Sequence, residues 1–79
     1  PVFKQYRDTD GRFYFKLADA DGNVLVQSTG FDSPKDAGKL IGVLKQAERA
    51  DAMETPEISL QVPVADVLAA LSALRAAEA

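Results

Sequence analysis

Residues 12–17 (RFYFKL) carry the pattern that most constrains the fold of this 79-residue chain. Apolar and polar side chains alternate strictly along this stretch: Phe13, Phe15 and Leu17 against Arg12, Tyr14 and Lys16. A period of two residues is typical of a β-strand with one buried and one wet face, whereas a helix would scatter the apolar residues around its axis. We therefore predict a central strand, with Phe13 and Phe15 beneath a helix and the tyrosines and basic residues on the reverse side.

The residues before this strand predict a hairpin. Residues 2–7 (VFKQYR) are typical of a first strand, and residues 8–11 (DTDG) form a turn that allows a three-residue loop with Gly11 in the left-handed conformation. This register keeps Phe3 on the apolar face, which is why we favour it. It also places two like pairs opposite each other: Tyr6 with Tyr14, and Lys4 with Lys16.

The third strand is predicted at residues 23–29. Asp21-Gly22 favours a two-residue type I′ turn, in which both central residues need positive φ. Such a turn would divide the strand into a buried and an outer set: Val24, Val26 and Ser28 against Leu25, Gln27 and Thr29. A three-residue loop would exchange the two sets.

A helix over residues 33–50 is expected to cover the sheet. Ser33 is a natural N-cap, and Pro34 suits the first helical position. Apolar residues then recur at helical spacing: Ala37, Leu40, Ile41, Leu44 and Ala47. Gly38 and Gly42 lie four residues apart on an adjacent face, and each costs about 1 kcal/mol relative to alanine in a helix interior. We therefore predict that this glycine face packs closely against another backbone.

The remaining residues predict one more strand and one more helix. Residues 50–57 (ADAMETPE) are interpreted as a loop, residues 58–62 (ISLQV) alternate as a fourth strand, and Pro63 ends it. An alanine-rich stretch over residues 64–78 has its own apolar stripe: Val64, Val67, Leu68, Leu71 and Leu74. We predict a single α+β domain, residues 1–79, in the order β-β-β-α-β-α, with residues 1–49 and 58–79 on either side of the loop. The partner strand of residues 58–62 is left open.

The composition argues against most chemistry. The chain has no cysteine and no histidine, so the commonest metal ligands and the commonest general base are missing. We predict no catalytic, cofactor-binding or metal-binding residues. No apolar run is long enough to span a bilayer, and the absence of cysteine fits a reducing compartment, so we expect a cytoplasmic protein. The net charge of −3 argues against broad electrostatic binding of nucleic acid.

The wet face of the sheet is the one candidate functional surface. Basic and aromatic residues are interleaved on it: Lys4, Tyr6, Arg12, Tyr14 and Lys16. Such a set can stack bases and contact phosphates. It can also serve as a protein interface, where tyrosine and arginine are favoured, or remain a solvated face with cross-strand tyrosine packing. The pattern leaves these three readings open.

Several motifs resemble the YegP-like family of small domains. The resemblance covers about residues 3–45 and is carried by Phe3-x-x-Tyr6, Asp10-Gly11-x-Phe13-x-Phe15-x-Leu17, Asp21-Gly22-x-Val24-Leu25, Ser28-x-Gly30-Phe31 and Ser33-x-x-x-Ala37-Gly38-x-x-Ile41. It implies a three-stranded sheet followed by a helix, as tandem repeats or as single units that pair. This chain has no second repeat and carries a strand and a helix instead. The resemblance implies a fold more than an activity, because the role of the family is uncharacterised. The alternative function that we predict from it is a module for protein interaction or homodimerisation with no nucleic-acid role.

A second resemblance implies a different role. Three segments are similar to the C-terminal extension of some bacterial tryptophanyl-tRNA synthetases: Phe3-Lys4-Gln5-Tyr6-Arg7, Gly11-Arg12-Phe13-Tyr14-Phe15-Lys16-Leu17 and Phe31-x-Ser33-Pro34-x-Asp36-Ala37-Gly38. This implies a non-catalytic appended domain that assists tRNA binding or assembly. Its partners would be tRNA, the catalytic domain of the parent chain or a second copy. The catalytic residues would then lie upstream, and a start at Pro1 fits a processed chain or a piece of a longer one.

Overall fold

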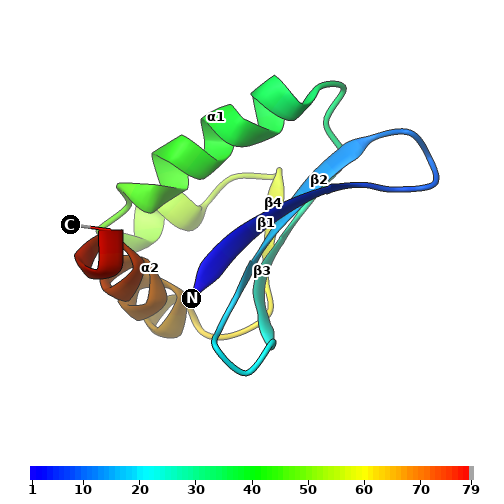
Figure 1. Ribbon diagram of the computed structural model, residues 1–79. Helices are drawn as coiled ribbons and strands as arrows, with labels where there is room; N and C mark the ends of the chain where they lie inside the picture. Colours follow the sequence, from blue (N-terminus) through cyan, green and yellow to red (C-terminus); the bar gives the residue numbers. More distant parts are fainter. Residues whose placement is uncertain (79) are drawn as a thin grey trace.

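A four-stranded antiparallel sheet with two helices on one face makes up the computed structural model, which describes residues 1–78 (Figure 1). The elements follow in the order β1 (Val2–Arg7), β2 (Phe13–Ala18), β3 (Val24–Ser28), α1 (Pro34–Lys45), a 3₁₀ turn (Ala50–Met53), β4 (Ile58–Leu60) and α2 (Val64–Glu78). The predicted α+β class and β-β-β-α-β-α order are confirmed. The sheet order is β1-β2-β3-β4, so the fourth strand pairs with β3. In the part of the chain described, neither helix has the length and apolarity to cross a membrane.

The first hairpin has the predicted register. Tyr6 lies opposite Tyr14, and Lys4 lies opposite Lys16. The turn is a three-residue loop in which the Gly11 N–H donates to the Asp8 carbonyl oxygen, and Gly11 has a φ of +80°. This positive φ is the conformation that glycine adopts without steric cost.

The second hairpin differs from the prediction in two ways that cancel. Its turn is a three-residue loop closed between Asp19 and Asn23, with positive φ only at Gly22, so the predicted type I′ turn is wrong. The Asp19 carboxylate accepts the N–H groups of Asp21 and Asn23, which stabilises this loop. A β-bulge then adds one residue to β3, and Leu25 is left without a partner on β2.

From Val26 onward, the bulge restores the predicted facing of β3. Val26 lies opposite Leu17 on the core side, Gln27 lies opposite Lys16 on the outer side, and Ser28 is buried. Leu25 was predicted on the outer face, and this is wrong, because the bulge turns it into the buried cluster. Val24 was predicted on the buried face, and this is wrong, because it lies opposite Ala18, only half-buried and outside the core cluster.

The core lies between one face of the sheet and both helices. Buried residues from every layer meet there: Phe15, Leu17 and Val26 from the sheet, Ala37, Ile41 and Leu44 from α1, and Val67 and Leu71 from α2. Phe15 is fully buried, with Phe3 edge-on at 5.9 Å and Phe31 stacked at 6.0 Å between ring centroids. Phe13 is only half-buried outside this cluster, with the Arg7 guanidinium 5.6 Å above its ring. The prediction of two phenylalanines in the core therefore holds for Phe15 alone.

Helix α1 begins as predicted and ends earlier. The Ser33 hydroxyl oxygen accepts the Asp36 N–H at 3.2 Å, which makes Ser33 the N-cap. The helix ends at Lys45 rather than at residue 50. Past this end, the Arg75 guanidinium of α2 donates to the carbonyl oxygens of Lys45 and Ala47 at 2.7 and 3.1 Å, which satisfies these two acceptors. A cation at this point also complements the negative end of the helix dipole.

Strands β2 and β3 separate on the N-terminal side of Lys16, where side chains replace the missing backbone hydrogen bonds. The Phe15 N–H donates to the buried Ser28 hydroxyl oxygen at 2.8 Å, and the Phe15 carbonyl accepts from the Gln27 amide at 3.3 Å. The chain returns to β2 at Phe31, which exchanges two backbone hydrogen bonds with Phe13.

Candidate functional site: the open face of the sheet

The sheet face opposite the helices brings together the predicted tyrosines and lysines. One row across the strands consists of Tyr6 and Tyr14 on β1 and β2. The next row crosses all four strands: Lys4, Lys16, Gln27 and Ser59. These positions follow from the alternation along each strand, because successive side chains point to opposite faces. Figure 1 shows both helices on the other side of the sheet.

The two tyrosines form a stacked pair. Their ring centroids are 5.6 Å apart and their planes differ by 14°. The Gln27 amide donates to the Tyr6 hydroxyl oxygen at 2.8 Å, and the Tyr14 hydroxyl donates to the Asp10 carboxylate. The same side-chain amide nitrogen of Gln27 also lies within hydrogen-bond distance of the backbone carbonyl oxygens of Phe15 and Ser28. The pair is therefore fixed at both hydroxyls.

The two lysines form a local positive site. Lys4 and Lys16 lie directly opposite each other, and within residues 1–78 neither has an acidic partner. The Lys16 Nζ lies 5.7 Å from the centroid of the Tyr6 ring, over its face. Like charges at directly opposite positions destabilise a sheet, so an anion bound between the two ammonium groups would relieve this repulsion.

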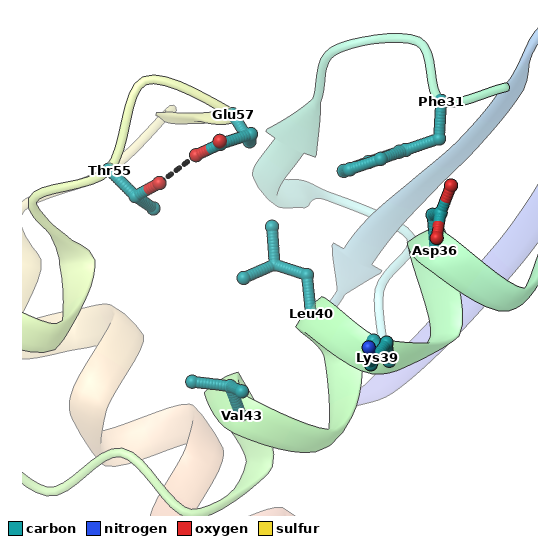
Figure 2. Close-up of a pocket in the computed structure, with 7 residues that line it drawn as sticks. All are labelled: Phe31, Asp36, Lys39, Leu40, Val43, Thr55 and Glu57. Carbon is teal, nitrogen blue, oxygen red and sulfur yellow. Dashed lines mark hydrogen bonds between the residues drawn. The ribbon is translucent and has the colours of Figure 1, made fainter.

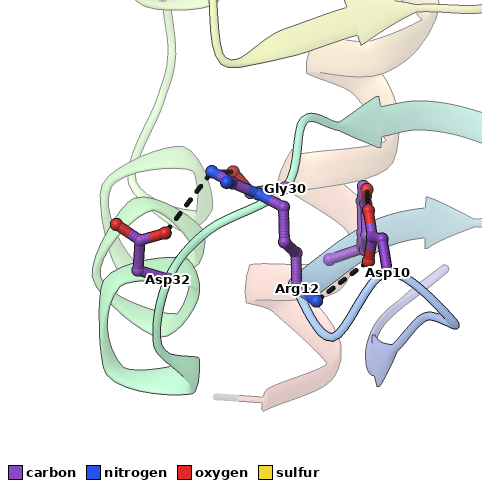
Figure 3. A network of polar contacts seen from close by, with 5 residues as sticks. Asp10, Arg12, Gly30 and Asp32 are labelled. Carbon is purple, nitrogen blue, oxygen red and sulfur yellow. Dashed lines mark hydrogen bonds and ion pairs between the residues drawn. The ribbon is translucent and has the colours of Figure 1, made fainter.

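Arg12 lies apart from the two lysines, in a network at the end of the sheet (Figure 3). Its Nη2 donates to the Gly30 carbonyl oxygen at 2.9 Å and lies 3.5 Å from Asp32 Oδ1. Its backbone N–H donates to Asp10 Oδ1 at 2.9 Å. Its guanidinium is thus paired with one carboxylate and its backbone N–H with another, and Arg12 ties the turn of the first hairpin to the segment that leads into α1.

The hydrogen bond between Tyr14 and Asp10 shifts the pKa values of both side chains. Donation from the Tyr14 hydroxyl, helped by the Arg12 N–H, lowers the pKa of Asp10. The same hydrogen bond raises the pKa of Tyr14. Asp10 therefore stays ionised and Tyr14 stays neutral around neutral pH, so the tyrosine hydroxyl remains a donor to the carboxylate.

The predicted glycine face makes no close backbone contact within residues 1–78. A Cβ placed on Gly38 would lie 3.6 Å from the Gln5 side-chain nitrogen, and one placed on Gly42 would have no heavy atom within 4 Å. Close packing at these glycines stays a prediction that concerns a second molecule.

A shallow groove of about 360 Å³ lies between α1 and the segment that leads into β4 (Figure 2). Its apolar wall includes Phe31, Leu40 and Val43, and Val43 is 61% exposed. On the opposite wall, the Thr55 hydroxyl donates to the Glu57 carboxylate and lowers its pKa. Sequence reasoning missed this groove, because the two walls are far apart along the chain. It also missed Ser59, although the alternation of residues 58–62 marked it as an outward position.

Curated proteins similar to this chain share one name. The chain is 56% identical over 77 residues to the tryptophan–tRNA ligase of Xanthomonas axonopodis pv. citri (strain 306), a match that covers 98% of this chain and 18% of the relative. It is 57% identical over 75 residues to the tryptophan–tRNA ligase of Xylella fastidiosa (strain 9a5c), covering 95% and 17%. The ligase of Bordetella pertussis (strain Tohama I / ATCC BAA-589 / NCTC 13251) is 41% identical over 59 residues, covering 75% and 12%.

Two other comparisons gave no match. No protein-family model matches the chain, and no solved structure does. The likeness to YegP-like domains therefore stays a prediction, while the likeness to tryptophanyl-tRNA synthetases is supported by relatives that match nearly the whole chain. The chain spans less than a fifth of the length of the curated relatives it matches. It is thus a homologue of one segment of the bacterial tryptophan–tRNA ligases, and it corresponds to a small part of such an enzyme rather than to the whole catalytic protein.

Proposed function

We propose that this chain is a non-catalytic domain appended to the C-terminal side of a tryptophan–tRNA ligase, and that the open face of its sheet contacts tRNA. The homology to a ligase segment supports the first part. The second part is carried by one observation, the Lys4–Lys16 pair without acidic partners in residues 1–78. Its other partner would be the catalytic body of the parent ligase, and it would work in the cytoplasm.

The charge distribution supports a local contact. A chain of net charge −3 does not attract RNA over its whole surface. The lysine pair lies at the middle of β1 and β2, and no acidic side chain in residues 1–78 is paired with it. Asp32, by contrast, is paired with Arg12 at the end of the sheet. Phosphates would therefore approach the open face at the lysine pair.

The test compares two matched pairs of lysine substitutions in the 79-residue chain. Lys4→Ala with Lys16→Ala removes two positive charges from the open face. Lys35→Ala with Lys39→Ala removes two exposed charges from α1, on the other side of the sheet. The first pair should weaken tRNA binding and reduce the slope of log K against log salt by about 1 per lysine. The second pair should leave both nearly unchanged. Equal losses in the two variants would refute the proposal.

A second candidate function is association with another copy of the chain. It is favoured by two neighbours on α1, Val43 with 61% exposure and Gly42 with open space where a Cβ would be. Together they offer a flat apolar strip for a second helix. Sedimentation velocity should then show a dimer at micromolar concentration that Gly42→Leu dissociates. A monomer throughout this range would reject the association.

A further inference from the structure

The tyrosine pair offers little free ring surface for stacking. Each ring has the other against one face, and the Tyr6 ring also has the Lys16 ammonium over it at 5.7 Å. Proteins that bind unpaired bases need exposed aromatic faces on which the bases stack. Tyr6 is 37% exposed, but the lysine over its ring competes with a base for that surface. Tyr14 is half-buried, and its hydroxyl is bonded to the Asp10 carboxylate, a group that repels phosphates.

The two hydroxyl groups differ in what they can still donate. The Tyr14 hydroxyl already donates a hydrogen bond to the Asp10 carboxylate. The Tyr6 oxygen instead accepts from Gln27, and its own proton has no acceptor in the described part of the chain. Gln27 is held by the carbonyl oxygens of Phe15 and Ser28, so the Tyr6 oxygen is fixed while its proton can turn toward an outside acceptor.

Three hydrogen-bond donors therefore lie in neighbouring rows of the open face: Lys4, Lys16 and the Tyr6 hydroxyl. A ligand that matches them is rich in acceptors and negative charge, which describes phosphate and 2′-hydroxyl oxygens. In a paired RNA stem the bases are stacked inside, and proteins contact mainly this backbone.

We infer that the open face binds the sugar–phosphate backbone of a paired RNA stem through Lys4, Lys16 and Tyr6, and that it does not stack unpaired bases. The inference rests on the proposed tRNA contact and specifies which kind of RNA surface is touched. Tyr14 has a different role, since it supports the Tyr6 ring and holds the turn through Asp10.

The experiment measures fluorescence anisotropy of two labelled RNAs with the 79-residue chain at one salt concentration. One RNA is a hairpin with a stem of about one helical turn, and the other is an oligouridine of equal length. The hairpin should bind more tightly. Tyr6→Phe removes one donor and should weaken hairpin binding by roughly two- to tenfold, the usual range for one hydrogen bond. Tyr14→Phe is the matched control and should change it by less than about twofold, because its hydroxyl proton is already used.

Circular dichroism of both phenylalanine variants verifies that the sheet is intact, since each keeps the ring pair. Oligouridine binding as tight as hairpin binding overturns the inference, and so does a Tyr6→Phe variant that binds like the parent. In both cases a lysine-dependent tRNA contact would still stand. Failure of the parent chain to bind either RNA would instead overturn the proposed function together with the inference.

Discussion

The buried hydroxyl of Ser28 joins β3 to β2 at the point where the two strands separate. Its oxygen accepts the N–H of Phe15 at 2.8 Å and donates to the Thr29 carbonyl oxygen at 2.9 Å. Ser28 is 6% exposed and Phe15 is fully buried, so water has no ready access to this N–H. Ser28→Ala should therefore leave a buried backbone donor without an acceptor.

The expected loss is large for a domain of this size. An unsatisfied buried donor costs roughly 1–3 kcal/mol. Loss of the hydrogen bond to the Thr29 carbonyl adds little to this cost, because Thr29 is exposed and water can replace the serine hydroxyl. A single small core supplies roughly 3–5 kcal/mol in total. A loss of about 2 kcal/mol would lower the melting temperature by roughly 8–16 °C.

Urea unfolding followed by far-UV circular dichroism measures this loss directly. Ser59→Ala is the matched control, because Ser59 is exposed on β4 and its hydroxyl oxygen accepts from the exposed Gln61 side chain rather than from a buried backbone group. It should change the unfolding free energy by less than about 0.5 kcal/mol. Ser28→Thr keeps the hydroxyl and should retain most of the stability. If Ser28→Ala is as mild as Ser59→Ala, the hydroxyl is not the group that satisfies Phe15, and the reasoning fails.

Three other substitutions test local geometry. Gly42→Ala should raise the unfolding free energy by up to about 1 kcal/mol, because a methyl group there meets no atom within 4 Å; a decrease in urea titration would contradict this. Gly30→Ala should lower it by about 1 kcal/mol, since its Cβ would lie 2.6 Å from Arg12 Nε, and Arg12→Ala in the same background should recover part of the loss. Tyr14→Phe should raise the pKa of Asp10 toward its ordinary value of 3.8, as followed by NMR titration. Because the folded pKa of Asp10 is lowered, the hydrogen bond stabilises the parent above about pH 3.8 and is lost as the pH falls below it, so the variant should lose less stability on acidification.

The features that could be predicted from the sequence are those set by neighbouring residues. Gly11 and the alternation of residues 12–17 determine the first hairpin and its register, and Ser33 with Pro34 determines the start of α1. The same alternation placed the lysines and tyrosines on one face, because side-chain direction along a strand is a local property.

The turn of the second hairpin was mispredicted although its partners are local, because Asp19 binds the N–H groups of Asp21 and Asn23. Other errors involve partners that are distant in sequence. Leu25 lies in the bulge of β3, and its carbonyl oxygen accepts the N–H of Gln61, the residue that follows β4. Helix α1 ends where Arg75 of α2 meets its last carbonyl groups. The facing of Val26, Gln27 and Ser28 was predicted correctly only because a wrong turn type and a missed bulge compensate each other from Val26 onward.

The candidate site shows the same division. The alternation predicted which side chains share the open face, but it could not predict which hydrogen bonds their polar groups make. Those hydrogen bonds depend on Gln27, which links Tyr6 to the interior backbone, and on Asp10, which accepts a hydrogen bond from the Tyr14 hydroxyl. It also could not predict that Arg12 would contact Gly30 and Asp32.

Because both helices cover the same side of the sheet, the residues that maintain the fold and those available for recognition are physically separate. Substitutions at Lys4 or Lys16 alter what the bare side attracts without removing any atom from the packed interior. Evolution or a protein engineer could therefore retarget this scaffold by a few exchanges on the bare side, with the hydrophobic layer unchanged.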